Sequence, residues 1–501
     1  MTAVEFADAF QFNNTYATLP AEFYEEIAPT PVNQPRLLIY NQTLASELRL
    51  PALNPNHKHW QIACEIFAGN RLPKGAQPIA QAYAGHQFGH FVPQLGDGRA
   101  VLLGEVIDRN QQRRDIQLKG SGPTCFSRSG DGRAPLGAVI REYLISEAMH
   151  ALGIPTTRSL AIVSTGEPVF RDQVLPGGVL TRIASSHIRV GTFEYFAARG
   201  QHHSLRLLAD YTLKRHYPEL TGHAQPYVEL LKAVMHKQCM LVSRWLSVGF
   251  IHGVMNTDNM TLSGETIDYG PCAFLDTYHP KTTFSSIDRY GRYCYENQRH
   301  IVGWNLACLA QCLLPVLHQK SEYAVELAQS ILSELNDTFD HYWLKVMAKK
   351  FGIHTPNNTD RHIIENFLNL LQYQQADFTN AFAALVLCQD TLQFDALKPF
   401  IGDSTQALQW LEKWQTRLKE RTQISSKQEI ISTLRQANPI YIARNHQVEK
   451  AIRTVEQENK LDEMNILLTV LQNPFTTNPN WQAFTEPPAD HERVLHTFCG
   501  T

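Results

Sequence analysis

The chain has 501 residues, and its 45 Lys and Arg against 48 Asp and Glu give a formal net charge of -3. This length allows a large core, and the near-neutral charge excludes a global positive field for non-specific binding to nucleic acid or membranes. The first residues, MTAVEFADAF, lack the basic flank and apolar run of an export signal, and no segment has the uninterrupted apolar length of a membrane span. We therefore expect a soluble, cytoplasmic protein without nucleic-acid or membrane partners; its oligomeric state is not predicted.

The nine cysteines are scattered without any C-x-x-C pair. This pattern argues against both a disulfide framework and a structural zinc ribbon. Cys308 and Cys312 have helical spacing in an apolar run, which favours a core stripe over a metal site. Cys499 differs because it lies close to the chain end, where residues are usually exposed.

The chain becomes regular after about residue 90; residues 1–90 mix short helical and extended pieces and read as an N-terminal elaboration. Residues 100–108 form an apolar run, residues 109–114 a polar turn, and residues 115–119 alternate again, which predicts a β-hairpin ending at Lys119. A Gly/Ser-rich loop follows. Apolar residues at helical spacing between Pro135 and Gly153 then predict a helix.

Two further strands are predicted around residues 160–163 and 179–183, followed by a long amphipathic helix over residues 227–250. That helix leads into HGVMNTDNM, residues 252–260. Residues 260–268 read as two very short strands around a Ser-Gly turn. The chain from about residue 299 to 471 is predicted to be mostly helical.

The order of these pieces is that of a protein-kinase-like fold. A glycine-bearing segment comes first, then a strand-end lysine, an acid on the next helix, and an Asp/Asn loop followed by Asp-x-Gly. We therefore expect an α+β, bilobal fold with an N-terminal elaboration (1–90), an N-lobe (91–185), a C-lobe with the catalytic loop (186–330) and a helical C-terminal extension (331–501).

Lys119 and Glu142 are the expected ion pair of such a fold. A nucleoside triphosphate needs positive charge to offset its phosphates, and a strand-end lysine needs an anionic partner on a rigid element. Glu142 has small and apolar neighbours at three- and four-residue spacing, which predicts that it points inward. Either residue alone would be interpreted as a surface charge; the strand–loop–helix context favours the pair.

The HGVMNTDNM and Asp-Tyr-Gly segments supply candidate metal ligands. Asn259 and Asp268 offer hard oxygen atoms suited to Mg²⁺ or Mn²⁺, and the adjacent Asp258 is a candidate base. A protein kinase places its catalytic Asp five residues before the metal-binding Asn, and that position is Val254 here. The sequence therefore leaves open whether this is a kinase without its catalytic base.

Two smaller motifs have competing interpretations. GDGR occurs at residues 96–99 and 130–133, either as two surface turns or as two glycine-rich loops that approach phosphates. His86 and His90 in GHQFGH have the spacing of a helical zinc site, but the flanking glycines weaken a helix and no third ligand is evident. We favour a structural role for the two histidines and predict no zinc.

Long motifs between residues 83 and 304 resemble the selenoprotein O family, the bacterial YdiU-type proteins. They are YAGHQFG, LGDGRA, QLKGSG, SGDGRAPLGAVIREYLISEAMHALGIPTTRSL, LTRIASSHIRVGTFEYFA, HGVMNTDNM, TIDYGPCAFLD and GRYCYENQ. The resemblance implies a kinase-like fold that transfers AMP from ATP to protein hydroxyl groups, with the nucleotide reversed relative to kinases. The α-phosphate would then face the acceptor, so the acid need not occupy the kinase position.

The resemblance also assigns roles. It places Lys119 on the phosphates with Glu142 as its partner, makes Asp258 the base, and makes Asn259 and Asp268 the metal ligands. Asp268 is also counted in the ATP pocket, together with the glycine loops and two arginines; these further residues are Gly96, Gly98, Arg99, Asp131, Gly132, Arg182 and Arg189. The implied partners are ATP, Mg²⁺ or Mn²⁺, and protein substrates with Ser, Thr or Tyr hydroxyls.

Cys499 matches the family's C-terminal selenocysteine or cysteine. Related bacterial proteins pair this residue with a cysteine after Asp-x-Gly, but residues 279–286 contain none here. Cys272 or Cys294 remains as a possible partner. Three alternatives to AMP transfer also stay open: UMP transfer from UTP, ordinary phosphoryl transfer, and a non-catalytic nucleotide-binding pseudokinase.

Overall fold

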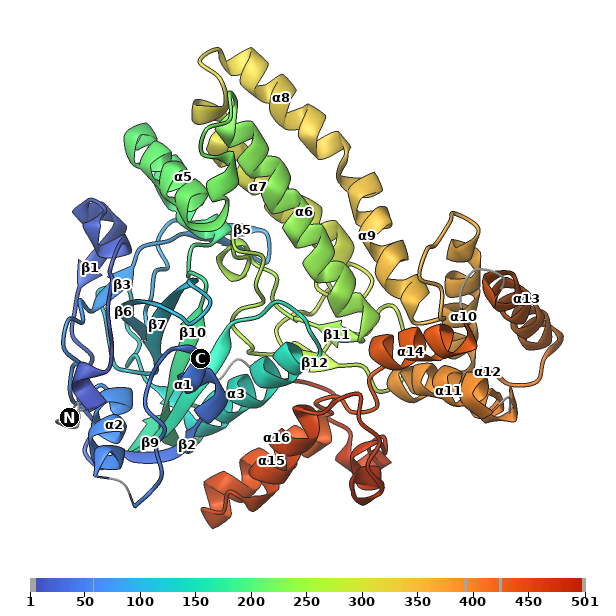
Figure 1. Ribbon diagram of the computed structural model, residues 1–501. Helices are drawn as coiled ribbons and strands as arrows, with labels where there is room; N and C mark the ends of the chain where they lie inside the picture. The colour runs from blue at the N-terminus through green and yellow to red at the C-terminus, as the bar shows by residue number, and fades with distance from the viewer. Residues whose placement is uncertain (1–5, 57, 392–393, 423–425, 498–501) are drawn as a thin grey trace.

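The computed structural model describes residues 6–56, 58–391, 394–422 and 426–497, and it has an antiparallel sheet followed by a helical region (Figure 1). The sheet has eight strands, in the order β1-β3-β6-β7-β10-β9-β2 with β8 paired to β10. They are β1 (Tyr24–Glu26), β2 (Arg36–Tyr40), β3 (Ile79–Gln81), β6 (Ala100–Ile107), β7 (Arg113–Lys119), β8 (Ala134–Pro135), β9 (Arg158–Phe170) and β10 (Val174–Ala184).

The predicted hairpin is confirmed, with Ala100 of β6 opposite Lys119 of β7. The two predicted later strands are also confirmed as β9 and β10, although both extend well beyond their apolar centres. Their additional residues pair with each other as a hairpin, so backbone hydrogen bonds continue where the apolar pattern has ended. Strands β1, β2 and β3 come from the N-terminal segment and belong to this same sheet.

Helices cover both faces of the sheet. Successive residues of β10 point to opposite sides, so Val179 packs in the core with α2 (His59–Ala68) and Leu180 packs in the core with α3 (Leu136–Ala151). The predicted helix after Pro135 is thereby confirmed as α3. It is followed by Gly153 with a φ of +72°, a conformation that favours glycine.

The region after the sheet is helical, as predicted. Two small two-stranded sheets interrupt the chain around it: β4 (Gly85–Gln87) with β5 (His90–Val92), and β11 (Phe250–Ile251) with β12 (Ala273–Phe274). The other helices are α1 (Gln42–Glu47), α4 (Val190–Ala197), α5 (His202–His216), α6 (Pro226–Ser247), α7 (Gln298–Leu317), α8 (Ser321–Ser333), α9 (Leu335–Lys349), α10 (Asp360–Gln374), α11 (Phe378–Thr391), α12 (Lys398–Ile401), α13 (Thr405–Thr422), α14 (Lys427–Ala437), α15 (Asn445–Glu458) and α16 (Asp462–Leu471).

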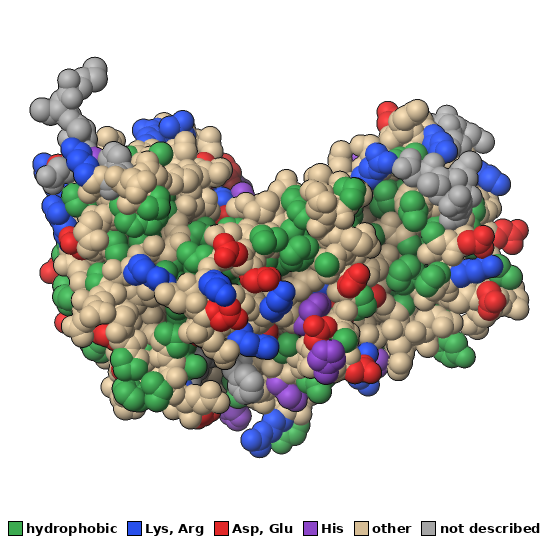
Figure 2. All heavy atoms as spheres, turned by 90° about the horizontal axis from the view of Figure 1, so that it is seen from below, with side chains coloured by type: hydrophobic (Ala, Val, Ile, Leu, Met, Phe, Trp, Pro, Cys, Tyr) green, Lys and Arg blue, Asp and Glu red, His purple; other side chains and the backbone are tan. Residues whose placement is uncertain are grey.

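Helix α7 is long and apolar enough to cross a membrane, but 61% of its most apolar window is buried inside the protein. It packs against α4, α6 and α8, which makes it a core helix of the fold. On the face seen in Figure 2, basic and acidic side chains lie next to each other, and this face has no continuous basic surface. The mixed charges on this face agree with the charge balance of the sequence.

The prediction of two short strands over residues 260–268 is wrong. Thr261 and Thr266 each form one isolated bridge, and each bridge is made with a distant residue, Arg189 and Thr156 respectively. These flanking segments supply the backbone partners that a local hairpin would otherwise supply. The segment therefore connects the predicted catalytic loop, residues 252–260, to Asp268. At the same time its bridges attach it to the sheet half of the protein.

The C-terminal helices pack beside the helix that carries Glu142 (Figure 1). Arg141 of α3 donates hydrogen bonds to Asn445 (2.8 Å) and Glu449 (3.0 Å) of α15, and also to the carbonyl of Cys272 (2.6 Å). Just before α15, the buried Arg444 contacts the carboxylates of Asp276 and Asp377. The C-terminal region thus supports α3 and the segment after Asp-Tyr-Gly.

Replacing Arg444 by Met should destabilise the protein, because it leaves Asp276 and Asp377 without their shared counter-ion. We expect a loss of about 3 kcal/mol in the free energy of unfolding, measured by denaturant titration. The control is Arg453→Met, at an exposed position on α15. Equal losses in the two variants would contradict the proposed role of Arg444.

Candidate functional site

All the predicted pocket and catalytic residues that the structure describes line one cavity of about 770 Å³. The cavity lies between the two GDGR loops, the end of β7, α3, β10, the catalytic loop and the Asp-Tyr-Gly segment. The predicted residues found there are Gly96, Gly98, Arg99, Lys119, Asp131, Gly132, Glu142, Arg182, Arg189, Asp258, Asn259 and Asp268. The fold therefore brings together residues that are up to 172 positions apart in the chain, from Gly96 to Asp268.

Lys119 forms the expected ion pair with Glu142. Its Nζ lies 2.7 Å from Glu142 Oε2 and 2.8 Å from Asp268 Oδ1. Lys119 is held at the end of β7 by pairing with Leu180 of β10 and Ala100 of β6, and Glu142 projects from α3, which packs on β9 and β10. The sheet and the helix thus fix the two charged groups from opposite sides.

Arg182 and Arg189 join Lys119, Glu142 and Asp268 in one buried cluster of charged side chains, the charged floor of the cavity. Arg182 is 1% exposed and donates to Glu142 Oε1 (Nε, 2.9 Å) and Asp268 Oδ1 (Nη2, 2.6 Å). Arg189 is 3% exposed, donates to Asp268 Oδ2 (2.9 Å), and lies over the ring of Tyr83. Sequence reasoning without the family resemblance would have placed both arginines at the surface; burial on β10 and at the start of α4 was not visible in their local pattern.

Asp268 is therefore shared by three cations. Burial alone would raise its pKa, but Arg182, Lys119 and Arg189 hold the pKa well below its usual value. The same cluster acts on Lys119, whose pKa is lowered by burial and by Arg182. Lys119, Arg182 and Arg189 face Glu142 and Asp268, and Arg189 also lies 3.9 Å from Asp97. These three buried cations are of the type that binds phosphate ligands.

The backbone at Asp268 is unusual. Its φ is +61°, in the left-handed region that side chains other than Gly, Asn and Asp seldom adopt. The preceding residue is fixed by His252, whose Nε2 lies 2.9 Å from the Ile267 carbonyl and whose ring stacks on Trp245. A buried histidine thus holds the chain where Asp268 turns into the cavity.

Asp258 is 8% exposed, and burial raises its pKa to about 6. Its Oδ2 accepts a long hydrogen bond from Gln87 Nε2 (3.4 Å), while Oδ1 has no hydrogen-bond partner among the described residues. Gly85 lies so close that an added Cβ would be 2.6 Å from Oδ1. Asp258 therefore lines the cavity with a carboxylate that has one long hydrogen bond and a raised pKa, which suits a proton acceptor.

The β4–β5 hairpin supports the catalytic loop. The backbone N–H of His86 donates to Thr257 Oγ1 (2.6 Å), and that of Phe88 donates to Asn256 Oδ1 (3.1 Å). These contacts explain why YAGHQFG lies beside HGVMNTDNM in the fold. Sequence reasoning did not assign this motif a chemical role, since nothing in its residue types alone points to the loop that it contacts.

Asn259 and Asp268 both present oxygen atoms that could bind a metal ion. Asn259 uses its amide nitrogen to donate to the Val254 carbonyl (2.9 Å), which leaves the amide oxygen as its remaining polar side-chain atom. Asp268 offers two carboxylate oxygens at the same cavity. This set of hard oxygen atoms fits Mg²⁺ or Mn²⁺.

The two GDGR segments meet through the loop at residues 122–127. Gly96 (φ +70°) would place a Cβ 2.2 Å from the Phe126 ring, and Gly132 (φ +66°) would place one 2.1 Å from Gly122. Both positions therefore require glycine for backbone conformation and for packing. Asp131 pairs with Arg171 at 2.9 Å on the cavity rim.

Asp97 is a cavity residue that the sequence analysis missed. It lies between Gly96 and Gly98, is 2% exposed, and accepts hydrogen bonds from Gln81 N (3.1 Å) and Gln117 Nε2 (3.2 Å). Burial raises its pKa, which Arg189 opposes. Its place inside LGDGRA was the only available signal, since Asp-Gly alone is typical of a turn.

The predicted histidine and cysteine features have different outcomes. His86 and His90 lie on the two strands of a hairpin and not on a helix, and His90 is exposed. Cys308 and Cys312 are buried in the core, as predicted. Cys499 lies outside the described residues, so its disulfide stays a prediction.

The chain was compared with known proteins. A family model described as "Protein adenylyltransferase SelO" matches residues 7–472. The chain belongs to this family. Proteins named "Protein nucleotidyltransferase YdiU" from Rhizobium meliloti (strain 1021) and Rhizobium rhizogenes (strain K84) are each 52% identical, over 98% and 99% of this chain and 100% and 98% of their own. One from Rhodopseudomonas palustris (strain BisB5) is 51% identical over 98% of this chain and 99% of its own.

These matches confirm the resemblance inferred from the motifs, and they extend it into the N-terminal and C-terminal thirds. The enzyme class is nucleotidyltransferase. The mixed fold of antiparallel sheet and helices is the one expected for this kinase-like family.

Replacing Gly85 by Ala should slow nucleotide transfer by roughly 10- to 100-fold, because the new methyl group displaces Asp258 by about an ångström. The rate of nucleotide incorporation into protein and the melting temperature are both measured. Gly222→Ala is the control, since a Cβ there meets nothing within 4 Å. A Gly85→Ala enzyme with unchanged transfer would show that the hairpin does not set the position of Asp258.

Proposed function

We propose that the protein is a metal-dependent adenylyltransferase that moves AMP from ATP to Ser, Thr or Tyr hydroxyls of proteins and releases pyrophosphate. The observation that carries this proposal is the position of Arg182 and Arg189. Both are almost fully buried at the cavity floor, where both contact Asp268. Charged guanidinium groups there favour phosphates, and the reversed orientation of the nucleotide is the one that the family resemblance implies.

The cavity offers complementary groups along a reversed triphosphate. Lys119, Arg182 and Arg189 would each give up part of their contact with the Asp268 carboxylate. They would bind the outer phosphates instead. Asn259 and Asp268 would hold Mg²⁺ or Mn²⁺, which supplies charge neutralisation on the phosphate oxygens. The two glycine loops at the other end are left for the nucleoside and the α-phosphate.

Asp258 is proposed as the base of the transfer step. It accepts the proton of the acceptor hydroxyl while that oxygen attacks the α-phosphorus. A new bond forms between the hydroxyl oxygen and the α-phosphorus, and the bond from that phosphorus to the bridging oxygen breaks. Pyrophosphate leaves with the bonding electrons, and AMP remains on the protein. The free Oδ1 of Asp258 supports this role.

Two neighbouring activities use the same site. UMP transfer from UTP is the nearer one, because selection of the base depends on contacts outside the charged floor. Phosphoryl transfer is disfavoured by Val254, which stands where a kinase has its catalytic acid. A purely non-catalytic role is disfavoured by the full set of phosphate and metal groups around one cavity.

We further propose that the enzyme works in the cytoplasm. None of the eight cysteines that the structure describes forms a disulfide, and seven of those eight are buried. Free thiols are maintained in a reducing compartment. ATP is abundant in the same compartment as potential protein substrates.

The test uses ATP carrying radioactive phosphorus at either the α or the γ position, incubated with the enzyme, Mg²⁺ or Mn²⁺, and a protein extract. Relative to the same extract without the enzyme, we expect additional protein-bound label from the α position only. Asp268→Asn and Asp258→Asn should each reduce incorporation by at least 100-fold, since Asp268 would hold the metal and Asp258 would accept the hydroxyl proton. The control Asp403→Asn changes an exposed loop acid and should leave incorporation unchanged.

Label from the γ position on protein would show that the enzyme is a kinase. If α-labelled UTP labels protein more strongly than α-labelled ATP does, the transferred group is UMP and not AMP. Unchanged incorporation in Asp268→Asn would remove the proposed metal site from the mechanism.

A further inference from the structure

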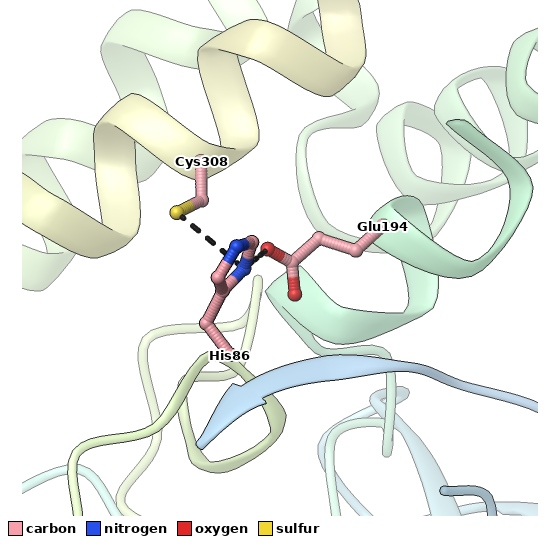
Figure 3. A group of neighbouring side chains, drawn as sticks. All are labelled: His86, Glu194 and Cys308. Carbon is pink, nitrogen blue, oxygen red and sulfur yellow. Dashed lines mark hydrogen bonds and ion pairs between the residues drawn. The ribbon is translucent and has the colours of Figure 1, made fainter. Parts of the chain in front are cut away.

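Three metal-ligating side chains meet outside the nucleotide cavity (Figure 3). They are His86 from β4, Glu194 from α4 and Cys308 from α7, and their ligand atoms all lie within 4.8 Å of one another. His86 Nδ1 is 2.5 Å from Glu194 Oε1 and 3.9 Å from Cys308 Sγ. Figure 3 shows the three side chains pointing toward one another from three separate elements.

We propose that His86, Glu194 and Cys308 form a zinc site. The nitrogen, oxygen and sulfur donors are those that Zn²⁺ accepts in a tetrahedral site, whereas Mg²⁺ and Mn²⁺ prefer oxygen alone. Three protein ligands leave one position for water. The His86 side chain is 26% exposed, so solvent reaches the cluster on that side.

The positions of the ligand atoms are close to those that zinc requires. Zinc bonds of about 2.0 to 2.3 Å at tetrahedral angles separate the ligand atoms by about 3.4 to 3.6 Å. The His86–Glu194 pair must open by about 1 Å and Cys308 must approach by less than that. The Glu194 and Cys308 ligand atoms lie within 4.8 Å of each other, so they too must approach by no more than about 1.5 Å. Movements of this size are within the range of side-chain rotation.

The charge of the three side chains also suits a divalent metal ion. A Cys308 thiolate and the Glu194 carboxylate together balance the two positive charges of Zn²⁺. A neutral complex is the form that a buried position tolerates best, because isolated buried charges are costly. Glu194 and Cys308 are both nearly inaccessible to solvent.

The surroundings resemble the outer shell of a metal site. The second oxygen of Glu194 accepts a hydrogen bond from the Thr257 hydroxyl, which orients the carboxylate. The His86 ring is packed edge-on against Trp304 of the same helix as Cys308. Thr257 also accepts the backbone N–H of His86 and directly precedes Asp258.

Bound zinc would therefore clamp the β4–β5 hairpin to α4 and α7, behind the catalytic loop. This site differs from the histidine pair considered in the sequence, because His90 takes no part in it. Its ligands are also different from those proposed for the nucleotide-bound metal. The inference stands on its own geometry and does not depend on which nucleotide the enzyme transfers.

The test uses the full-length protein, freed of metal with a chelator and titrated with Co²⁺ in the absence of nucleotide. We expect about one Co²⁺ per chain, with a thiolate-to-cobalt charge-transfer band in the near ultraviolet and intense visible bands of a tetrahedral site. Zn²⁺ should bleach these bands by displacement. Removing zinc should lower the melting temperature by several degrees.

Cys308→Ser should abolish the charge-transfer band, and His86→Gln should weaken cobalt binding by at least tenfold. The control Cys239→Ser changes a thiol buried in α6, and Asp268→Asn changes the nucleotide site; both should keep the band. Circular dichroism checks that each variant is folded. A wild-type protein without a thiolate band, or loss of the band in Cys239→Ser, would overturn the proposal.

Discussion

The shared carboxylate of Asp268 is the interaction on which the site depends. Lys119, Arg182 and Arg189 converge on it from β7, β10 and the start of α4, and burial strengthens each contact. Without a ligand, Asp268 and Glu142 balance most of this positive charge. In the proposed function, a triphosphate with its metal would take over these cations while Asp268 turns to the metal, so the positive groups that the reaction needs are already gathered at one place.

The rest of the fold holds these charged residues and the catalytic loop in fixed positions relative to each other. The sheet holds Lys119 and Arg182, and α3 brings Glu142 across it. The C-terminal helices fix α3 through Arg141, a support that links the end of the chain to the site. On the other side, the β4–β5 hairpin holds Asp258 and its neighbours, and the proposed zinc site would fasten that hairpin to two helices.

Much of this arrangement could be predicted from the sequence. The β6–β7 hairpin, α3 and the long helix α6 follow from apolar periodicity, and the Lys119–Glu142 pair follows from the order of those elements. Periodicity could not show that Thr261 and Thr266 bridge to distant segments, because such bridges leave no local pattern. Nor could it bring His86, Glu194 and Cys308 together, since their convergence depends on how three separate elements pack.

The most direct test is a crystal structure of the protein with Mg²⁺ and an ATP analogue that cannot be cleaved. The account predicts that the α-phosphorus lies beside Asp258, with the outer phosphates on Arg182 and Arg189. An adenine ring on those arginines, with the γ-phosphorus beside Asp258, would contradict it.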